Sequence, residues 1–414
     1  MTYSRSRTQS KQKSQKRYKK KLLFMINGIL LTAIVIAGAL IWTANNNQEA
    51  GENKPGMSEA HSTPSPSGNS SAAPSPESTD DSLATPTSEE KASTPPGHEG
   101  DKISLALVGD ILPAARVLEL MNQNGYDYPY RKAKEILSAA DITAGNLESS
   151  ITTRGTAAEN KQYLFRAPPE TLPAIKEAGF DYLSLANNHS MDYGWEGLSD
   201  TMDSLDDIEL QHSGSGNDDV EAFTPAYIER KGITVAFVSV TRVVPEPSWK
   251  ADRNHAGVAE AYSPNRAVGA IKEAKKNADL VVVMVHWGEE RSEKPIAHQT
   301  DLGHRFVDAG ADLVVGSHPH VLQGIEAYKG KWIAYSLGNF VFSTTTSSKT
   351  SETGVLNAEC DKAGACSLTF HPMFATNSQP APMDPVKGKE LLKRLSTLSI
   401  GAAVEEDGSI VADH

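Results

Sequence analysis

The sequence contains very few cysteines, only Cys360 and Cys366 in 414 residues. Two cysteines cannot complete a Cys₄ zinc site, and their spacing does not fit a zinc knuckle. If this part of the chain lies outside the cytoplasm, a local disulfide between them is the favoured interpretation. Two free thiols in a loop are the alternative.

Several motifs of common enzyme classes are also missing from the chain. There is no Gly-x-x-x-x-Gly-Lys-Ser/Thr loop for the phosphates of ATP. There is no Gly-x-Ser-x-Gly elbow and no His motif matching the Cys pair, which disfavours Ser or Cys nucleophilic catalysis. The Gly-x-Gly-x-x-Gly fingerprint does not follow the first expected strand, which disfavours a dinucleotide-binding Rossmann sheet.

Charged side chains are absent from residues 22–44. That length suits a transmembrane helix, which needs about 20 apolar residues. The preceding tail, 1–21, carries nine Lys and Arg residues, so we expect it to stay in the cytoplasm while the rest crosses. A cleaved signal peptide is the alternative, but the run exceeds the roughly 7–15 residues of an h-region and no clear Ala-x-Ala site follows. We therefore expect a single-pass protein of the cell membrane with an extracytoplasmic C-terminal domain.

Large apolar side chains are nearly absent from residues 45–100, which are rich in Pro, Ser, Thr, Gly and Glu. Such a segment buries too little surface to offset its ordering entropy, so we expect a disordered linker, or stalk. The folded domain is expected at 101–375, with a C-terminal extension at 376–414. The chain has 40 Lys and Arg against 52 Asp and Glu, and nine of the basic residues lie in the tail. An acidic ectodomain argues against nucleic acid as a partner and against broad electrostatic capture of a polyanion.

Apolar strand-like runs alternate with amphipathic stretches in the folded part. Strands are expected at Ile103–Val108, Ile142–Ala144, Asp181–Ala186, Thr234–Val240, Leu280–Val285, Leu313–Val315, Lys331–Tyr335 and Asn339–Phe342. Helices are expected near Arg131–Ala139, Pro169–Ala178, Trp195–Leu205, Pro264–Asn277, Asp301–Ala309 and Gly388–Thr397. This alternation predicts a layered α/β architecture, with a purely parallel Rossmann-like sheet as the alternative.

Polar side chains recur where the apolar runs end. They are Asp110, Asn146, Glu148, Asn187, Asn188, His189, His286, His318 and His320. Residues just past strand ends converge on one crevice of an open α/β sheet. Imidazole and carboxylate groups are the usual ligands of divalent transition metals, so the set predicts a metal site.

Each of these residues also has a structural interpretation. Asp110 could be a helix N-cap, Glu148 a solvated loop acid and Asn187 a turn former. A lone His such as His286 after a strand is often structural. The strongest motif is His318-Pro319-His320, because two His separated by one residue on an extended segment point to the same side. The proline between them fixes its own φ and stiffens the pair.

Seven motifs between Ser104 and Phe342 carry a resemblance to a known family. They are LVGDILPAAR, AGNLESSI, YLFRAPPE, SLANNHSMDYG, VMVHWGEE, GSHPHVLQGIE and YSLGNF. They resemble the CapA family of poly-γ-glutamate capsule biosynthesis proteins, whose domain is similar to the calcineurin-like metallophosphoesterases. The resemblance implies a layered metallophosphoesterase-like β-sandwich flanked by helices. It also implies poly-γ-glutamate and membrane-bound poly-γ-glutamate synthase subunits as partners.

The resemblance also suggests roles for the polar residues. It implies one or two divalent ions, Mn, Zn or Fe, held by Asp110, Glu148, Asn188, His286, His318 and His320. His189 would protonate or orient the leaving oxygen, and Asp192 would orient His189 or else start the following helix. Leu112 stands where the first phosphoesterase motif, Asp-x-His, has its histidine.

Four further residues are expected to bind substrate. Arg166 could clamp a carboxylate or phosphate, or make a surface ion pair instead. Trp287 follows His286 in a loop that could form a pocket wall. Asn146 and Asn339 are expected in the same crevice, although Asn339 could be a turn residue. His298 and His304 are interpreted as structural or solvated.

Three functions remain open from the sequence. The first is a membrane-anchored component of poly-γ-glutamate assembly or export, in which ligation energy comes from elsewhere because no ATP-binding loop is present. The second is an extracytoplasmic metal-dependent hydrolase of phosphoester or peptide-like bonds. The third is a metal-free scaffold for the synthase complex.

Overall fold

A computed structural model describes residues 102–343 and 348–413 of the chain. The expected basic tail (1–21), transmembrane helix (22–44) and linker (45–100) lie outside the described residues. Within the described part, no helix combines the length and apolar character that a membrane span requires.

The larger of two main sheets has ten strands in the order β19-β20-β17-β16-β1-β2-β5-β6, with β15 beside β1 and β18 beside β17. β1 pairs parallel with β2 and β15, and β5 pairs parallel with β2 and β6. β16 pairs antiparallel with β1, and the strands after it pair antiparallel with their neighbours. The strands are β1 (Lys102–Ile111), β2 (Ile142–Leu147), β5 (Tyr182–Ser184), β6 (Gln211–Ser213), β15 (Asn339–Val341), β16 (Glu352–Asp361), β17 (Cys366–Thr376), β18 (Gln379–Pro382), β19 (Ala402–Val404) and β20 (Ser409–Ala412).

The smaller main sheet has six strands in the order β13-β14-β12-β11-β9-β8. Its central strands β9, β11, β12 and β14 are parallel, and β8 and β13 are antiparallel edges. The strands are β8 (Ala226–Arg230), β9 (Ile233–Thr241), β11 (Leu280–His286), β12 (Leu313–Ser317), β13 (Ile325–Tyr328) and β14 (Lys331–Ala334). Two short pairs complete the strands, β3 (Ser150–Ile151) with β4 (Arg166–Ala167) and β7 (Ser215–Gly216) with β10 (Gly257–Val258).

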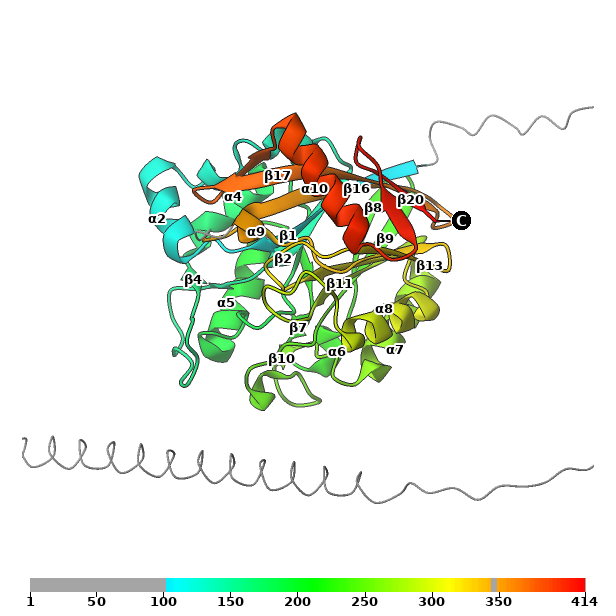
Figure 1. Cartoon of the computed structure of the whole chain (residues 1–414). Helices are drawn as coiled ribbons and strands as arrows, with labels where there is room; N and C mark the ends of the chain where they lie inside the picture. Colours follow the sequence, from blue (N-terminus) through cyan, green and yellow to red (C-terminus); the bar gives the residue numbers. More distant parts are fainter. Residues whose placement is uncertain (1–101, 344–347, 414) are drawn as a thin grey trace, which may run out of the picture. The chain divides into compact units, whose positions relative to one another are not determined.

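Helices flank the two sheets (Figure 1). The α-helices are α2 (Ala115–Asn124), α3 (Lys134–Ser138), α4 (Leu172–Glu177), α5 (Gly194–Asp207), α6 (Asp219–Ala222), α7 (Pro264–Asn277), α8 (Ala297–Ala309), α9 (Ser348–Ser351) and α10 (Pro385–Leu398). Three short 3₁₀ turns are η1 (Tyr128–Tyr130), η2 (Pro169–Thr171) and η3 (Pro247–Trp249). Helix α7 has the predicted bounds and begins with Pro264, which suits a first helical position because its missing N–H would be unpaired there anyway.

Alternation along the central strands builds three apolar layers. In β1, Leu105 and Leu107 face the core between the sheets, while Ala106 and Val108 face the helices outside. In β11 every residue is buried, because alternate side chains face the inter-sheet core and the layer under α7 and α8. A strand covered on both faces reads as a continuous apolar run, as the sequence indicated. The predicted layered α/β sandwich flanked by helices is therefore confirmed, and the Rossmann alternative is wrong because two sheets stack.

The expected C-terminal extension, 376–414, packs into the same sandwich. Strands β18 and β20 both pair with β17 of the larger sheet. Leu391, Leu392 and Leu395 of α10 join the core between the sheets. These residues follow the helical spacing that gives α10 one apolar face. The segment thus contributes to the core that positions the strands.

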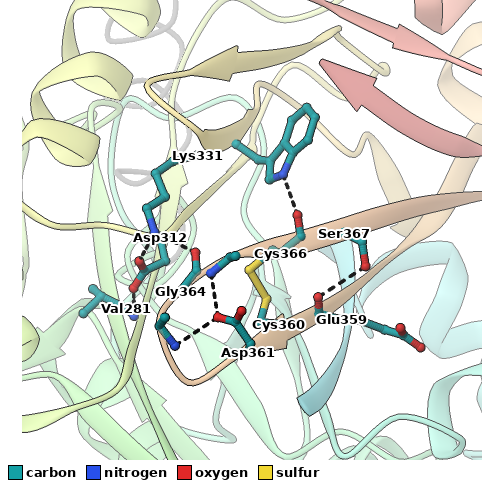
Figure 2. The surroundings of a disulfide bond; sticks show 12 residues. Val281, Asp312, Lys331, Glu359, Cys360, Asp361, Gly364, Cys366 and Ser367 are labelled. Atoms are coloured by element: carbon teal, nitrogen blue, oxygen red, sulfur yellow. Dashed lines mark hydrogen bonds and ion pairs between the residues drawn. A yellow bond between two sulfur atoms is a disulfide. The ribbon is translucent and has the colours of Figure 1, made fainter. Parts of the chain in front are cut away.

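The predicted disulfide is confirmed, and it joins Cys360 to Cys366 across the β16–β17 hairpin. Figure 2 shows the contacts that tie this hairpin end to the smaller sheet. Nζ of Lys331 lies 2.6 Å from Oδ1 of Asp312 and 2.6 Å from the carbonyl oxygen of Gly364. Nε1 of Trp332 donates to the Cys366 carbonyl at 2.8 Å. The disulfide therefore closes a turn that is itself anchored to the second sheet.

Candidate metal centre

The carboxyl ends of parallel strands from both sheets bring the predicted donors together. Asp110 lies near the end of β1 and Glu148 directly after β2. His286 is the last residue of β11. Asn188 follows β5, and His318 and His320 follow β12. Asp110 and His318, which are 208 positions apart in the sequence, thus meet because strand ends share one edge, as the pattern predicted.

Glu148 stands at the centre of this group. Its carboxylate belongs to two sets of possible ligand atoms, one with His286 and His318 and the other with Asp110 and His320. Oε1 of Glu148 lies 3.7 Å from Nε2 of His286 and 3.9 Å from Nε2 of His320. Within each set the ligand atoms all lie within 4.8 Å of one another. A single carboxylate shared by two sets has the arrangement of a bridging ligand.

The Glu148 carboxylate has no hydrogen-bond partner of its own. Both of its oxygens are buried and unpaired among the described residues, and so is Nδ1 of His318. Burial raises the pKa of Glu148 well above its ordinary value, and the charge of Asp110 raises it further. Burying an ionised carboxylate is costly unless a cation or hydrogen bonds compensate it. Orphaned carboxylate oxygens beside imidazole nitrogens fit a divalent ion such as Mn, Zn or Fe.

His286 is oriented with one nitrogen toward the centre. Nδ1 lies 2.9 Å from Oγ of Ser317 and 3.3 Å from Nδ2 of Asn146. Nε2 therefore points into the site, where it lies 2.8 Å from Oδ1 of Asn188. This pairing also aims the Asn188 amide oxygen at the same point, as expected for an oxygen ligand. Burial, together with the charges of the other imidazoles, lowers the pKa of His286 well below its ordinary value, which keeps the ring neutral for metal binding.

His318 and His320 converge, but not in the way the sequence suggested. Both lie beyond the end of β12 and have positive φ values, 96° and 57°, instead of an extended conformation. A residue other than glycine in this left-handed region of backbone φ costs about 1–3 kcal/mol, and such strained residues cluster at functional sites. The turn, not strand alternation, directs both rings to the centre, with their centroids 5.8 Å apart.

The two imidazoles have opposite electrostatic surroundings. Burial lowers the pKa of His318 to about 3, helped by the charge of His320. Burial would also lower the pKa of His320, but the carboxylates of Glu148 and Asp110 raise it to about 9. Without a metal, His320 is thus the cation that partly neutralises the two acids. A divalent ion would take over that role and leave His320 neutral, as a ligand must be.

Asn146, Asn187 and Asn339 hold the donors in place. Nδ2 of Asn146 donates to Oδ1 of Asp110 at 2.9 Å, and its own Oδ1 accepts from Nδ2 of Asn187 at 3.1 Å. Oδ1 of Asn339 lies 2.9 Å from Nδ1 of His320, which leaves Nε2 of that ring for the centre. Asn146 and Asn339 are 1% and 3% exposed and orient metal-ligand candidates, as the supporting polar residues of metal sites do. Their role in binding substrate stays a prediction.

His189 and Asp192 form a pair beside the centre, as the sequence indicated. Nδ1 of His189 lies 2.7 Å from Oδ2 of Asp192, and Nε2 of His189 faces Oε1 of Glu148 at 3.9 Å. Burial lowers the pKa of His189, although the hydrogen bond to Asp192 opposes this. A neutral ring that donates from Nδ1 to the carboxylate keeps its Nε2 lone pair toward the crevice. That atom is the one positioned to exchange a proton with a ligand.

Lys161 is a half-buried cation beside this pair that the sequence did not reveal. Its Nζ contacts Oδ1 of Asp192 and the Asn188 carbonyl oxygen, and lies 3.0 Å from Nδ1 of His189. Burial lowers the pKa of Lys161, and the ion pair with Asp192 opposes that effect. Lys161 comes from the irregular segment between β3 and β4, so no periodic pattern marked it. Asn187 and Ser317 were likewise missed as supports, because each reads locally as a turn or strand-end residue.

Trp287 and Arg166 are the other two residues that the sequence suggested for binding substrate, and the structure places them in different surroundings. Trp287 is fully buried among α8 and β14 side chains, and its Nε1 donates to the Tyr335 carbonyl at 2.9 Å. The ring of Trp287 therefore belongs to the core, and its role in binding substrate stays a prediction. Arg166 is exposed, and its guanidinium carbon lies 4.3 Å from the ring centroid of Tyr193. It makes no ion pair among the described residues, and its role in binding substrate stays a prediction.

Leu112 explains why the set of possible ligand atoms that contains Asp110 lacks a further histidine. Its side chain is fully buried in the apolar layer outside the larger sheet, with Val117 and Leu147 among its cluster. The position that would hold a histidine in the phosphoesterase motif therefore points into the core. The second set of ligand atoms consists of Asp110, Glu148 and His320 alone.

Comparison with known proteins places these residues within one matched region. Residues 104–344 match the family model described as bacterial capsule synthesis protein PGA_cap. The chain is 34% identical over 329 residues to the PGA biosynthesis protein CapA of Bacillus subtilis (strain 168), which covers 78% of this chain and 86% of that protein. It is 33% identical over 306 residues to the capsule biosynthesis protein CapA of Bacillus anthracis, which covers 72% of this chain and 74% of that protein. Among solved structures, NAD nucleotidase of Haemophilus influenzae matches with a TM-score of 0.42 and 12% identity, over 72% of this chain and 57% of that one.

Proposed function

The chain belongs to the bacterial capsule synthesis protein family PGA_cap, and we propose that it acts in the biosynthesis or export of a poly-γ-glutamate capsule. Family membership confirms the resemblance carried by the seven motifs. Two relatives are named for PGA or capsule biosynthesis, and a third, from Mycobacterium tuberculosis, is named a probable polyglutamine synthesis accessory protein. Because that relative is named an accessory protein, its name supports a role beside a synthase. We therefore propose membrane-bound synthase subunits as partners.

We further propose that the site is a working metal-dependent hydrolytic centre. The observation that carries this proposal is the buried Glu148 carboxylate, unpaired at both oxygens and shared by two sets of ligand atoms. Asp110, Glu148, Asn188, His286, His318 and His320 would hold one or two ions. A divalent ion in such a site supplies Lewis acidity and activates water at neutral pH.

The residues of the chain would divide the remaining work. His189 would move a proton at Nε2, with Asp192 fixing the ring through Nδ1. Lys161 would hold Asp192 and the Asn188 backbone together, so that the proton donor and the amide ligand keep one spacing. Arg166, exposed and unpaired, would attract a carboxylate or phosphate of the substrate. The reaction class is hydrolysis of a phosphoester or a peptide-like bond.

A strain that lacks the gene provides the test. Wild-type protein should restore polymer, whereas Asp110→Ala and His189→Ala should not, although His189→Ala should keep its fold and metal. Removing a residue that exchanges a proton with the reacting group typically costs about 10²–10⁴ in rate. Ser199→Ala on the outside of α5 is the matched control and should restore polymer fully. Normal polymer of normal length from both site variants would remove the hydrolytic proposal and leave a scaffold.

The location of the domain rests on the uncharged run 22–44 and the basic tail. We propose an anchored chain with its N-terminus in the cytoplasm and the metal centre outside. Protease added to intact protoplasts should then remove the domain from the anchored chain. Survival of the domain until the membrane is permeabilised would contradict this orientation.

A further inference from the structure

Two cations gather on one tyrosine ring without any acidic partner. The guanidinium carbon of Arg242 lies 3.9 Å from the ring centroid of Tyr262, and Nζ of Lys250 lies 4.1 Å from the same centroid. Among the described residues neither cation makes an ion pair, although many basic side chains of this acidic domain do, for example Lys161, Lys275 and Lys331. Tyr262 is 41% exposed and both cations are partly exposed, so this cluster is accessible to solvent.

Two separate contacts place this cluster near the metal centre. Arg242 directly follows β9, and its backbone N–H donates to the carbonyl of His286 at 2.8 Å. Lys250 directly follows Trp249, whose ring centroid lies 5.3 Å from Nζ of Lys161. That same Nζ lies 3.0 Å from Nδ1 of His189. The backbone of Arg242 therefore contacts that of a metal-ligand candidate, and Lys250 follows a residue whose ring lies near Lys161 of the His189 pair.

The ring is held in place, and this fixes where the cations stand. The Tyr262 hydroxyl accepts a hydrogen bond from the Val244 backbone N–H at 3.2 Å, and the Tyr262 backbone N–H donates to Oε2 of Glu260 at 2.6 Å. An aromatic face attracts cations, which offsets part of the repulsion between two like charges. Glu260 is used by the backbone and pairs with neither cation. The remaining repulsion would be relieved by anionic groups that contact the two cations.

We propose that Arg242 and Lys250, presented on the Tyr262 ring, form a subsite for the side-chain carboxylates of a polyglutamate chain beside the metal centre. This proposal deepens the proposed function and rests on it for the identity of the polymer. It also answers a difficulty of charge, because an acidic domain repels a polyanion unless unpaired cations act locally. A planar guanidinium binds a carboxylate bidentately, and the lysine ammonium adds a second point of attraction.

Binding of fluorescent poly-γ-glutamate of defined length to the metal-loaded, full-length protein in detergent tests the subsite. Arg242→Gln/Lys250→Gln should weaken binding roughly tenfold or more, since each lost charge contact is worth a factor of several. The matched control is Lys134→Gln/Lys272→Gln, which removes the same charge from two exposed, unpaired lysines on α3 and α7. The control should bind within about twofold of wild type, because surface charges far from a site act weakly. Arg242→Lys/Lys250→Arg keeps both charges and should retain most of the affinity.

Several outcomes would overturn the subsite. Unchanged affinity in the Gln pair, or an equal loss in the control pair, would show that binding is general electrostatics. Stronger Arg242-dependent binding of a polyphosphodiester than of poly-γ-glutamate would show that the ligand class is wrong. If the double variant does not fold by circular dichroism, Lys250→Gln alone is judged by the same criteria. Metal content is measured in every variant. If the purified protein holds no metal but still binds the polymer through Arg242, the hydrolytic proposal is contradicted and the subsite proposal stands.

Discussion

Replacing Glu148 with glutamine should have opposite effects on the metal-free and metal-loaded protein. Without metal the carboxylate is buried, unpaired and close to Asp110, and burial raises its pKa well above the ordinary 4.5. Glutamine keeps the shape and removes the charge. With metal, the same carboxylate is the one ligand that both sets share. The variant should therefore be the more stable protein in chelator and the less stable one in metal.

The sign of the pH dependence follows from the raised pKa. A carboxyl whose pKa is higher in the folded than in the unfolded state stabilises the fold fully below its unfolded pKa, and this contribution is lost as the pH rises through the folded pKa. Wild type should therefore lose stability relative to Glu148→Gln as the pH rises above 4.5, by at most about 1.36 kcal/mol per pH unit. Because the Glu148 carboxylate also raises the pKa of His320, the difference between the two curves reports this carboxyl together with its effect on His320.

Urea unfolding of the full-length protein, followed by tryptophan fluorescence, measures both effects. Metal at 100 times its dissociation constant should stabilise wild type by about 2.7 kcal/mol, and most of this should disappear in the variant. A flat difference curve between pH 4.5 and 6, together with equal stabilisation of both proteins by metal, would refute the shared-carboxylate reasoning.

Three further changes test the surroundings of the centre. Lys161→Met should lower the unfolding free energy by about 3 kcal/mol because it leaves Asp192 buried without its cation, and Lys161→Arg should recover part of this in thermal unfolding. Asn339→Ala should weaken metal binding by about 10–100-fold in competitive titration, because Nδ1 of His320 loses the oxygen that orients the ring, while unfolding of the metal-free protein changes much less. Cys360→Ala/Cys366→Ala opens a turn of sequence separation 6 and should cost about 2 kcal/mol in urea, with metal content unchanged; metal loss in this pair would show that the hairpin reaches the centre.

The sequence indicated which strand ends meet, because side-chain periodicity and polar strand ends are local signals. Helix α7 and the buried strand β11 were both recognisable from spacing alone. The antiparallel hairpin β16–β17 was missed, since Thr353 to Leu356 of β16 are buried in a row instead of alternating with exposed residues, and no turn dipeptide such as Asn-Gly marks the hairpin. Sheet order was also beyond the sequence, because pairing of β1 with β16 joins residues that periodicity cannot connect.

Some residues of the candidate site could likewise be predicted from the sequence, and others could not. Asp110, Glu148 and the histidines could be predicted, because donors of this kind at strand ends are informative by type. The sequence suggested Trp287 as a pocket wall because it is a large aromatic beside a site residue, but it could not show that the ring fills the core under α8. Lys161 could not be found, since its burial against Asp192 depends on how an irregular loop returns to the crevice.

Metal content is the most direct test of a metal centre built around Glu148. The full-length wild-type protein, purified without chelator, should contain one to two equivalents of Mn, Zn or Fe by elemental analysis. His318→Ala/His320→Ala should lose most of it. His298→Ala/His371→Ala, which removes two histidines outside both ligand sets, should keep it. Equal metal content in wild type and in both double variants would contradict the account.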